Sequence, residues 1–280
     1  MSATSKSGRI KPLPHPLFCL LFCNPETALT LFAVFCCLSC VISLRADDAP
    51  NPVFVQRAEK ALAAAKGRLD SNTNDPTALW QFSRAAFDLA DLQTADPRRK
   101  DIAEKGIAAA QQLLAANTNS VEGHYYLGMN MGELAETETL GALKLVREME
   151  TEFILVLHTN AAFDNAGPDR NLGLLYRDCP GWPASIGNRA KARQHLQQAV
   201  ILTPGFPENL LNLIEAEIKW AEPAEAKRDL KTLDELWPKS HQLYAGEAWE
   251  PGWVDWNKRR DEAHKKLATA DTVATSPHDK

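Results

Sequence analysis

Residues 190–204, AKARQHLQQAVILTP, align without gaps on residues 224–238, AEAKRDLKTLDELWP, and this internal echo decides the fold. The two segments begin 34 residues apart, and apolar residues recur in both at helical spacing. A period of this length is typical of a pair of helices that stacks on its neighbours in a solenoid. The sequence therefore predicts an all-α architecture. Five aligned pairs are identical: Ala190/Ala224, Ala192/Ala226, Leu196/Leu230, Leu202/Leu236 and Pro204/Pro238.

The first 46 residues have the pattern of a targeting segment. Lys6, Arg9 and Lys11 form a basic start, residues 28–44 carry no charge, and Ala46 precedes a polar stretch. A positive region, an apolar region and a small residue at a cleavage point are the parts of a signal peptide. We expect cleavage after Ala46.

Two alternatives to cleavage remain open. The uncharged run of 17 residues is at the lower limit of what spans a bilayer, so the segment could persist as a membrane anchor. Leu38-Ser39-Cys40 also has some likeness to a lipoprotein signal, although the apolar run continues past Cys40. All three readings predict that the rest of the chain is periplasmic or secreted, membrane-anchored if the segment is retained.

Charge and cysteine usage narrow the partners. Removal of residues 1–46 takes away four basic residues and one acidic residue, and changes the net charge from −5 to −8. An acidic surface disfavours nucleic acid as the partner. Cys179 is the one cysteine outside residues 1–46, so no disulfide can form within the cleaved chain. We expect Cys179 to be packed as a small apolar side chain.

The remaining chain reads as successive helices. Helical patterns are predicted at 53–69, 77–92, from 96 onward, at 121–133, at 140–157 and from 170 onward, followed by the two echoing segments. Pro251 begins a capping helix with Trp253 and Trp256 on its apolar face. We expect about four repeats plus this cap in residues 47–268, and a disordered tail at 269–280.

Two further motifs identify the repeat type. Leu172-Gly173 with Tyr176, and Leu127-Gly128, resemble the first-helix signature of the tetratricopeptide repeat (TPR), a helix–turn–helix unit. The longer stretch GPDRNLGLLYRDCPGWPASIG (167–187) and GHYYLG (123–128) resemble the T-component family of tripartite ATP-independent periplasmic (TRAP) transporters. That resemblance implies a periplasmic helical protein with a ligand cleft, assembled around a pore and working beside a solute-binding protein.

An insertion separates Tyr176 from the helix that carries Ala192. Residues 179–186 lengthen this connection, and two prolines and a glycine stiffen it around Trp182. A stiff loop with an aromatic tip on a helical scaffold is suited to recognition. The alternative is that Trp182 folds back between helices and Asn188 serves as a helix N-cap.

A binding face is predicted on the first helices of the repeats. Arg170 is the first choice for a functional charge, because a guanidinium can capture a small carboxylate ligand through two hydrogen bonds. Its alternative is an ion pair with Asp169, Asp178 or a neighbouring repeat. The candidate binding residues are His124, Tyr125, Met131, Arg170, Asn171, Tyr176 and Trp182.

Catalysis has little support in the sequence. The HExxH, GxSxG and phosphate-loop motifs do not occur, and His124, His158 and His195 each stand alone on a predicted helix. We therefore expect no catalytic residue, metal or cofactor. The sequence predicts a non-enzymatic binding or scaffold module with a protein partner, for example as an accessory of TRAP-type uptake. The alternative is an adaptor or a structural homo-oligomer that binds no small molecule.

Overall fold

The computed structural model describes residues 50–138 and 141–274, with only the backbone described for residues 270–274. The predicted targeting segment, 1–46, lies outside these residues, as does the end of the predicted tail. Across the described ranges the chain is helical and contains no β-strand. None of the helices described is long and apolar enough to cross a membrane. The predicted all-α class is thus confirmed.

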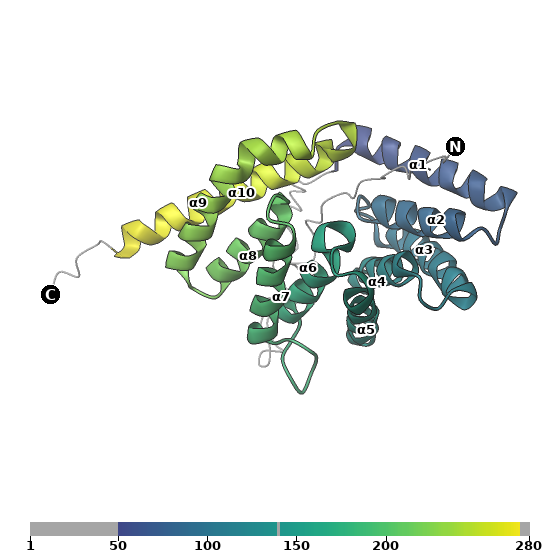
Figure 1. Cartoon of the computed structure of the whole chain (residues 1–280), viewed down its shortest axis with the longest axis horizontal. Coiled ribbons are helices and arrows are strands. Elements are labelled where there is room, and N and C mark those ends of the chain that lie inside the picture. Colours follow the sequence, from purple (N-terminus) through teal and green to yellow (C-terminus); the bar gives the residue numbers. More distant parts are fainter. Residues whose placement is uncertain (1–49, 139–140, 275–280) are drawn as a thin grey trace, which may run out of the picture. The chain divides into compact units, whose positions relative to one another are not determined.

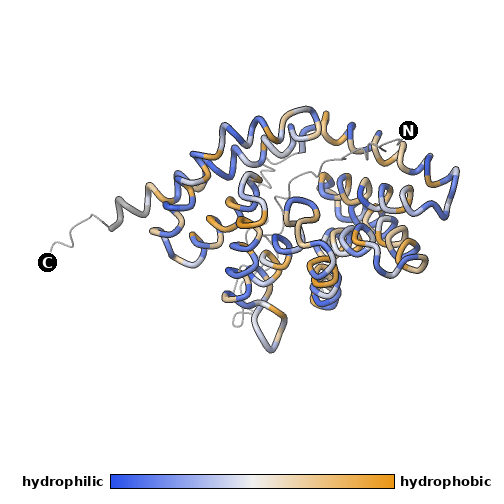
Figure 2. Tube along the Cα trace, viewed as in Figure 1, coloured by the Kyte–Doolittle hydropathy of each residue, from blue (hydrophilic) through white to orange (hydrophobic). Residues whose placement is uncertain are grey.

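The described helices follow one another through short connections (Figure 1). Apolar and polar residues alternate along them with the helical period (Figure 2). They are α1 (Pro52–Ser71), α2 (Pro76–Ala90), α3 (Asp96–Ala116), α4 (Val121–Glu136), α5 (Ala142–Asn160), α6 (Phe163–Asp178), α7 (Arg189–Leu202), α8 (Pro207–Lys219), α9 (Pro223–Leu243), the short 3₁₀ helix η2 (Glu247–Trp249) and α10 (Glu250–Ala274).

Local sequence accounts for where several helices begin. The side chains of Asn51, Asp75 and Ser120 accept hydrogen bonds from backbone amides in the first turns of α1, α2 and α4. Proline occupies the first turn of α1, α2, α3, α8 and α9, where its missing N–H costs nothing. The turn before Val121 therefore ends in Ser120, a residue type that is common at N-caps.

The chain forms two compact units, and the division falls inside α5, between Met149 and Glu150. In the unit before the division, α2 packs against α1, α3 and α4, and α3 also packs against α4. Two buried apolar clusters hold these helices together. One contains Ala86, Leu89, Ile102 and Ala103, and the other contains Leu79, Phe82, Ala109 and Leu113.

In the unit after the division, α6 packs against α7, α7 against α8, and α8 against α9. Helix α10 lies alongside α8 and α9, in the place of the predicted cap (Figure 1). The echoing residues Ala192, Leu196, Ala226 and Leu230 are all buried. The 34-residue echo is therefore an echo of packing positions, repeated in the hairpins α6–α7 and α8–α9.

Two helices continue past boundaries drawn from the sequence. Helix α9 runs beyond Pro238, where the second echoing segment ends, to Leu243, because the added turn packs into an aromatic cluster. There the ring of His241 stacks on Trp253 at 3.5 Å between centroids, and Trp237 meets Trp253 edge to face at 5.3 Å. Helix α10 continues to Ala274, so the helical part extends past the tail boundary predicted at residue 269.

Candidate functional site

The connection between α6 and α7, residues 179–188, is a loop closed at its neck by backbone hydrogen bonds. The amide of Gly187 donates to the carbonyl of Pro180 at 2.9 Å, and the amide of Asn188 donates to the carbonyl of Tyr176 at 2.8 Å. A Cβ atom at Gly187 would lie 2.0 Å from the carbonyl oxygen of Cys179, so only glycine allows this approach. Figure 1 shows the loop extending from the ends of the two helices.

Trp182 lies at the far part of this loop with 88% of its surface exposed. The amides of Ala184 and Ser185 both donate to the carbonyl of Gly181, which folds the segment after Trp182 into a turn. The alternative in which Trp182 folds back between helices is wrong, because its side chain is not buried. The other half of that alternative is correct: the Asn188 side chain caps α7 by accepting from the Lys191 amide at 3.0 Å.

Basic and aromatic side chains lie just beyond the loop, where α7 begins and α8 ends. The guanidinium carbons of Arg189 and Arg193 lie 5.2 Å and 4.7 Å from the ring centroid of Trp220. Both arginines also pair with Glu222, Arg193 at 2.5 Å. The hydrogen bond from Arg193, followed by that from Arg189, lowers the pKa of Glu222. Trp220 thus packs against the guanidinium groups of Arg189 and Arg193. The sequence analysis did not identify this cluster.

Tyr176 lies inside the helix packing rather than on an open face. Its hydroxyl donates to Glu150 at 2.5 Å, and its ring stacks against His195 at 5.5 Å and under the Lys191 ammonium at 4.7 Å. Burial, followed by the hydrogen bond to Glu150, raises the pKa of Tyr176. The Nδ1 atom of His195 lies 2.8 Å from Asp169, so this histidine is paired and not isolated.

Arg170 is buried, with 1% of its surface exposed, and every contact described for its guanidinium is made within the chain. Asp164, Asn165 and Ala166 have positive φ and form a left-handed turn at the start of α6. Arg170 donates to the carbonyls of Asp164 and Asn165 at 3.2 and 3.1 Å. Because non-glycine residues rarely adopt this conformation, the turn needs such support. Arg170 thus orders the turn, which is a structural role in place of the predicted ligand contact.

The acidic partners of Arg170 agree with one of the predicted alternatives, an ion pair with a neighbouring repeat. Its Nε atom lies 3.8 Å from Glu208 of α8, and its Nη2 atom lies 3.3 Å from Asp164, whereas Asp169 and Asp178 are not its partners in the ion pairs described. Asp178 pairs instead with Arg177 at 2.7 Å and with Lys219 at 3.0 Å. Spacing along one helix predicts i, i+4 pairs, but these partners come from a turn and from α8.

The remaining predicted site residues are also packed within the protein. Asn171 is buried on α6. His124, Tyr125 and Met131 lie on α4 in the unit before the division, where Tyr125 is fully buried and meets Tyr126 edge to face at 5.3 Å. The Nε2 atom of His124 lies 2.8 Å from the carbonyl oxygen of Thr118. Of the seven predicted residues, Trp182 is therefore the one with a largely exposed side chain.

The described part of the chain contains neither a reactive thiol nor a cluster of metal-binding side chains. Cys179 is buried at the neck of the loop, where burial, followed by the charge of Asp178, raises the pKa of its thiol to about 12. A thiol with this pKa is protonated at neutral pH and is a poor nucleophile. Among the residues described, no three His, Cys, Asp or Glu side chains are grouped to hold a metal ion.

Comparisons with known proteins bear mainly on the fold. Residues 52–144, less than half of the chain, match the family model "Regulator of microtubule dynamics protein 1-3". No curated protein matches the sequence significantly. Two structures of MamA resemble this one at 18% identity with TM-scores of 0.48 and 0.42; the first similarity covers 67% of this chain and 92% of MamA, the second 69% and 89%.

The structure is also similar to that of TTC0263, a thermophilic TPR protein of Thermus thermophilus. It has 20% sequence identity and a TM-score of 0.56, and covers 75% of this chain and 91% of TTC0263. At this identity the likeness concerns the fold alone. The resemblance to TRAP T-components stays a prediction, whereas the predicted repeat architecture is supported by both packing and comparison: this chain has the fold of TPR proteins.

Proposed function

We propose that this protein is a non-enzymatic binding module outside the cytoplasm, and that it contacts a protein partner through the α6–α7 loop. The observation that carries the proposal is the 88% exposed indole of Trp182 on a loop whose neck is closed by hydrogen bonds. Tryptophan is among the residues most enriched at binding hot spots, where it buries a large area. A loop that is already ordered loses little conformational entropy when it binds.

The charged side chains next to the loop fit a protein partner as well. Arg189 and Arg193 at the start of α7 give the surface cationic and aromatic character, which is typical of interface centres. Their pairing with Glu222 keeps these long side chains in defined positions. The partner surface that we expect therefore has an apolar recess for the indole and acidic or backbone acceptors around it.

The finer proposal is that the partner is a periplasmic solute-binding protein and that the chain is an accessory of TRAP-type uptake. The motif in residues 167–187, which contains Trp182, is the support for this. The similarity of residues 52–144 to a family named for regulating microtubule dynamics concerns the other unit. It supports a role exerted through other proteins rather than through catalysis.

Site-specific photo-crosslinking tests the proposal in cells that export the full chain. A benzophenone amino acid replaces Trp182 in one variant and Ile201 in the matched control, since Ile201 is also an exposed apolar side chain (69%) but lies on α7. We expect a discrete adduct from position 182 that is absent from position 201. Equal labelling at both positions, or none at position 182, would refute the proposed site.

Light scattering and thermal shift separate the alternative functions. An adduct of twice the chain mass, with a stable oligomer that Trp182→Ser dissociates, would replace the proposal by a structural homo-oligomer. A rise in melting temperature with a small carboxylate would support a ligand cleft. Such a shift should persist in Trp182→Ser if the ligand site and the loop are separate.

A further inference from the structure

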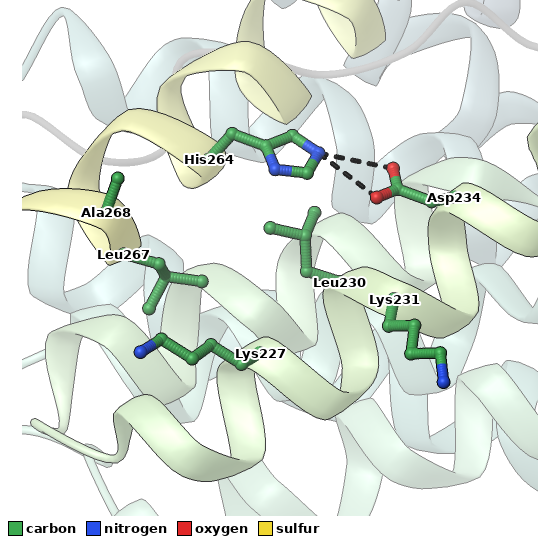
Figure 3. Close-up of a pocket in the computed structure, with 7 residues that line it drawn as sticks. All are labelled: Lys227, Leu230, Lys231, Asp234, His264, Leu267 and Ala268. Atoms are coloured by element: carbon green, nitrogen blue, oxygen red, sulfur yellow. Dashed lines mark hydrogen bonds and ion pairs between the residues drawn. The ribbon is translucent and has the colours of Figure 1, made fainter. Parts of the chain in front are cut away.

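Glu217, near the end of α8, is a buried acid without the cationic partner that a buried carboxylate needs. Its side chain is fully buried, and within the part of the chain that the structure describes neither of its carboxylate oxygens accepts a hydrogen bond. Asp234 of α9 shows the usual arrangement, because it accepts from Arg260 at 2.6 Å and lies 3.2 Å from His264 (Figure 3). An unpaired carboxylate removed from water is costly, so we expect Glu217 to be protonated in the folded protein.

The side chain that Glu217 meets belongs to a second acid, Asp229 of α9. Two ionised carboxylates offer only acceptors to each other, so a hydrogen bond between them requires that one acid keeps its proton. Asp229 has a cation, because Arg228 lies 2.8 Å from it, whereas Glu217 has no partner in the ion pairs described. The proton therefore belongs to Glu217, whose pKa is raised by burial and then by the charge of Asp229.

Three charged groups act on Glu217 from the helices packed on α8. Asp229 and Arg228 lie on α9, and Arg193 lies on α7, where its positive charge favours the ionised form of Glu217. The amide of Glu222, in the turn between α8 and α9, donates to the Glu217 carbonyl at 2.9 Å, and the Glu222 carboxylate is bound by Arg193. Arg193 is thus the cation that Glu217 and Glu222 have in common.

Arg193 has donors left for a second acid. It binds Glu222 through its Nη2 atom, at 2.7 and 2.5 Å from the two oxygens, and its Nε and Nη1 atoms donate no hydrogen bond among the contacts described. The other two helices that pack on α8 are α6 and α10, and their cations Arg177 and Arg259 both pair with Glu215. Arg193 is therefore the cation that can turn toward an ionised acid at the end of α8.

We propose that the protonation state of Glu217 controls the position of Arg193. While Glu217 holds its proton, it donates to Asp229, and Arg193 remains on Trp220 and Glu222. When Glu217 releases the proton to solvent, the buried carboxylate draws Arg193 away from the Trp220 ring, because a buried negative charge is stable only when a cation pairs with it. The contact between α7, α8 and α9 is thus a pH-sensitive switch.

The consequence of the switch rests on the proposed function, since Arg193 belongs to the surface beside the α6–α7 loop. Both arginines of that surface, Arg189 and Arg193, contact Trp220 while Glu217 is protonated. In alkaline medium the surface loses one of them, so a partner that meets these cations should bind less tightly. A protein outside the cytoplasm takes the pH of its surroundings, and the switch adjusts its binding to that pH.

Carbon-13 NMR of the full chain measures the proton on Glu217 directly. The carboxyl resonance, assigned from its loss in Glu217→Gln, should titrate with a midpoint near pH 8 rather than near pH 4.5. A midpoint near pH 4.5 would overturn the proposal. Circular dichroism over the same range checks that the chain stays folded.

A fluorinated tryptophan at position 220 reports the movement of Arg193. Its fluorine resonance should shift with the midpoint of Glu217 in the parent and should not shift in Glu217→Gln, in which the amide replaces the protonated acid as a donor to Asp229. Glu235→Gln is the matched control, because it removes a carboxylate from an exposed position on α9 and should leave the shift intact. A fluorine signal that ignores the titration of Glu217, or one that shifts equally in Glu217→Gln, would reject the switch.

Crosslinking from position 182 separates the switch from the loop proposal. At about pH 9 the yield of the partner adduct should be about two- to fivefold lower than at about pH 6, and Glu217→Gln should show no such difference. The same loss in both proteins would mean that another group responds to pH, and would reject the regulation. If position 182 gives no adduct at either pH, the loop proposal fails, while the two NMR titrations still decide for or against the switch.

Discussion

Replacement of Arg170 by alanine should strongly lower the free energy of unfolding of the unit that begins at Glu150. This effect should appear in the absence of any ligand. The guanidinium is buried and contacts two backbone carbonyls of the left-handed turn, the Asn209 amide oxygen at 3.3 Å, and the carboxylates of Asp164 and Glu208. The guanidinium carbon of Arg170 also lies 5.2 Å from the ring centroid of Phe206. Arg170→Ala removes all of these partners at once.

The magnitude follows from the groups left behind. Asp164 and Glu208 are almost fully buried and would remain as acids that have lost their cation. Breaking a buried ion pair by deleting one partner typically costs ~3–5 kcal/mol. The freed carbonyls of the turn add to this, although the contributions share one side chain and are not additive. For a unit of this size we expect the melting temperature to fall by roughly 10–20 °C.

Urea unfolding at pH 7, followed by circular dichroism at 222 nm, measures the effect. Arg228→Ala is the matched control, because Arg228 is an exposed arginine paired with its neighbour Asp229, and such pairs contribute only ~0–1 kcal/mol. Arg170→Lys should fall in between, since an ammonium keeps the charge but not the fork of donors. If Arg170→Ala unfolds with the midpoint of Arg228→Ala and loses only ligand binding, Arg170 is a site residue and our reasoning is wrong.

Three further substitutions test other parts of the structure. Trp256→Ala should cost ~3–5 kcal/mol in the same urea assay, because its fully buried ring packs edge to face on Phe206 at 5.3 Å, whereas exposed Val254→Ala on the same helix should cost little. Gly187→Ala should cost ~1–3 kcal/mol by forcing the loop neck apart and should abolish crosslinking from position 182, while Gly67→Ala, which has open space around it, should be neutral or stabilising. Burial, reinforced by the charge of Asp229, raises the pKa of Glu217 to about 8, so the folded state holds a proton that the unfolded chain releases near pH 4.5. The free energy of unfolding should therefore fall as pH rises from about 5 to about 8. Urea titrations across this range should show that slope in the parent and a flatter one in Glu217→Gln.

The fold was largely predictable from the sequence because its packing is periodic. Ala192 and Leu196 recur as Ala226 and Leu230, and all four are buried in the helix packing. The starts of α1, α2 and α4 were predictable too, since Asn51, Asp75 and Ser120 act on amides only two or three residues away, whereas α6 begins at Phe163 and not near residue 170. The end of α9 was not, because it depends on contacts of His241 with Trp253 that no local pattern records.

The site was less predictable, because exposure is a property of the packed structure. A sequence identifies Arg170 as a cation, but only its distance to Asp164 and Glu208 shows that the charge is consumed within the chain. Residues 179–186 interrupt the repeat period, and that interruption is a local signal which sequence reasoning could use for Trp182.

The residues that stabilise the unit after Glu150 lie outside the far part of the α6–α7 loop. The unit after Glu150 is held together by Arg170 at the start of α6 and by the aromatic cluster around Trp256, and neither involves the far part of the α6–α7 loop. The loop is tied to the scaffold at its neck, through backbone hydrogen bonds to Tyr176 and Pro180 and the close approach of Gly187. On the proposed function, substitutions at Trp182 should change what is bound at almost no cost in stability, whereas substitutions at Arg170 or Gly187 should destabilise the unit. The stretch 167–187 would then combine residues that stabilise the fold, near its two ends, with an exposed residue between them that contacts the partner.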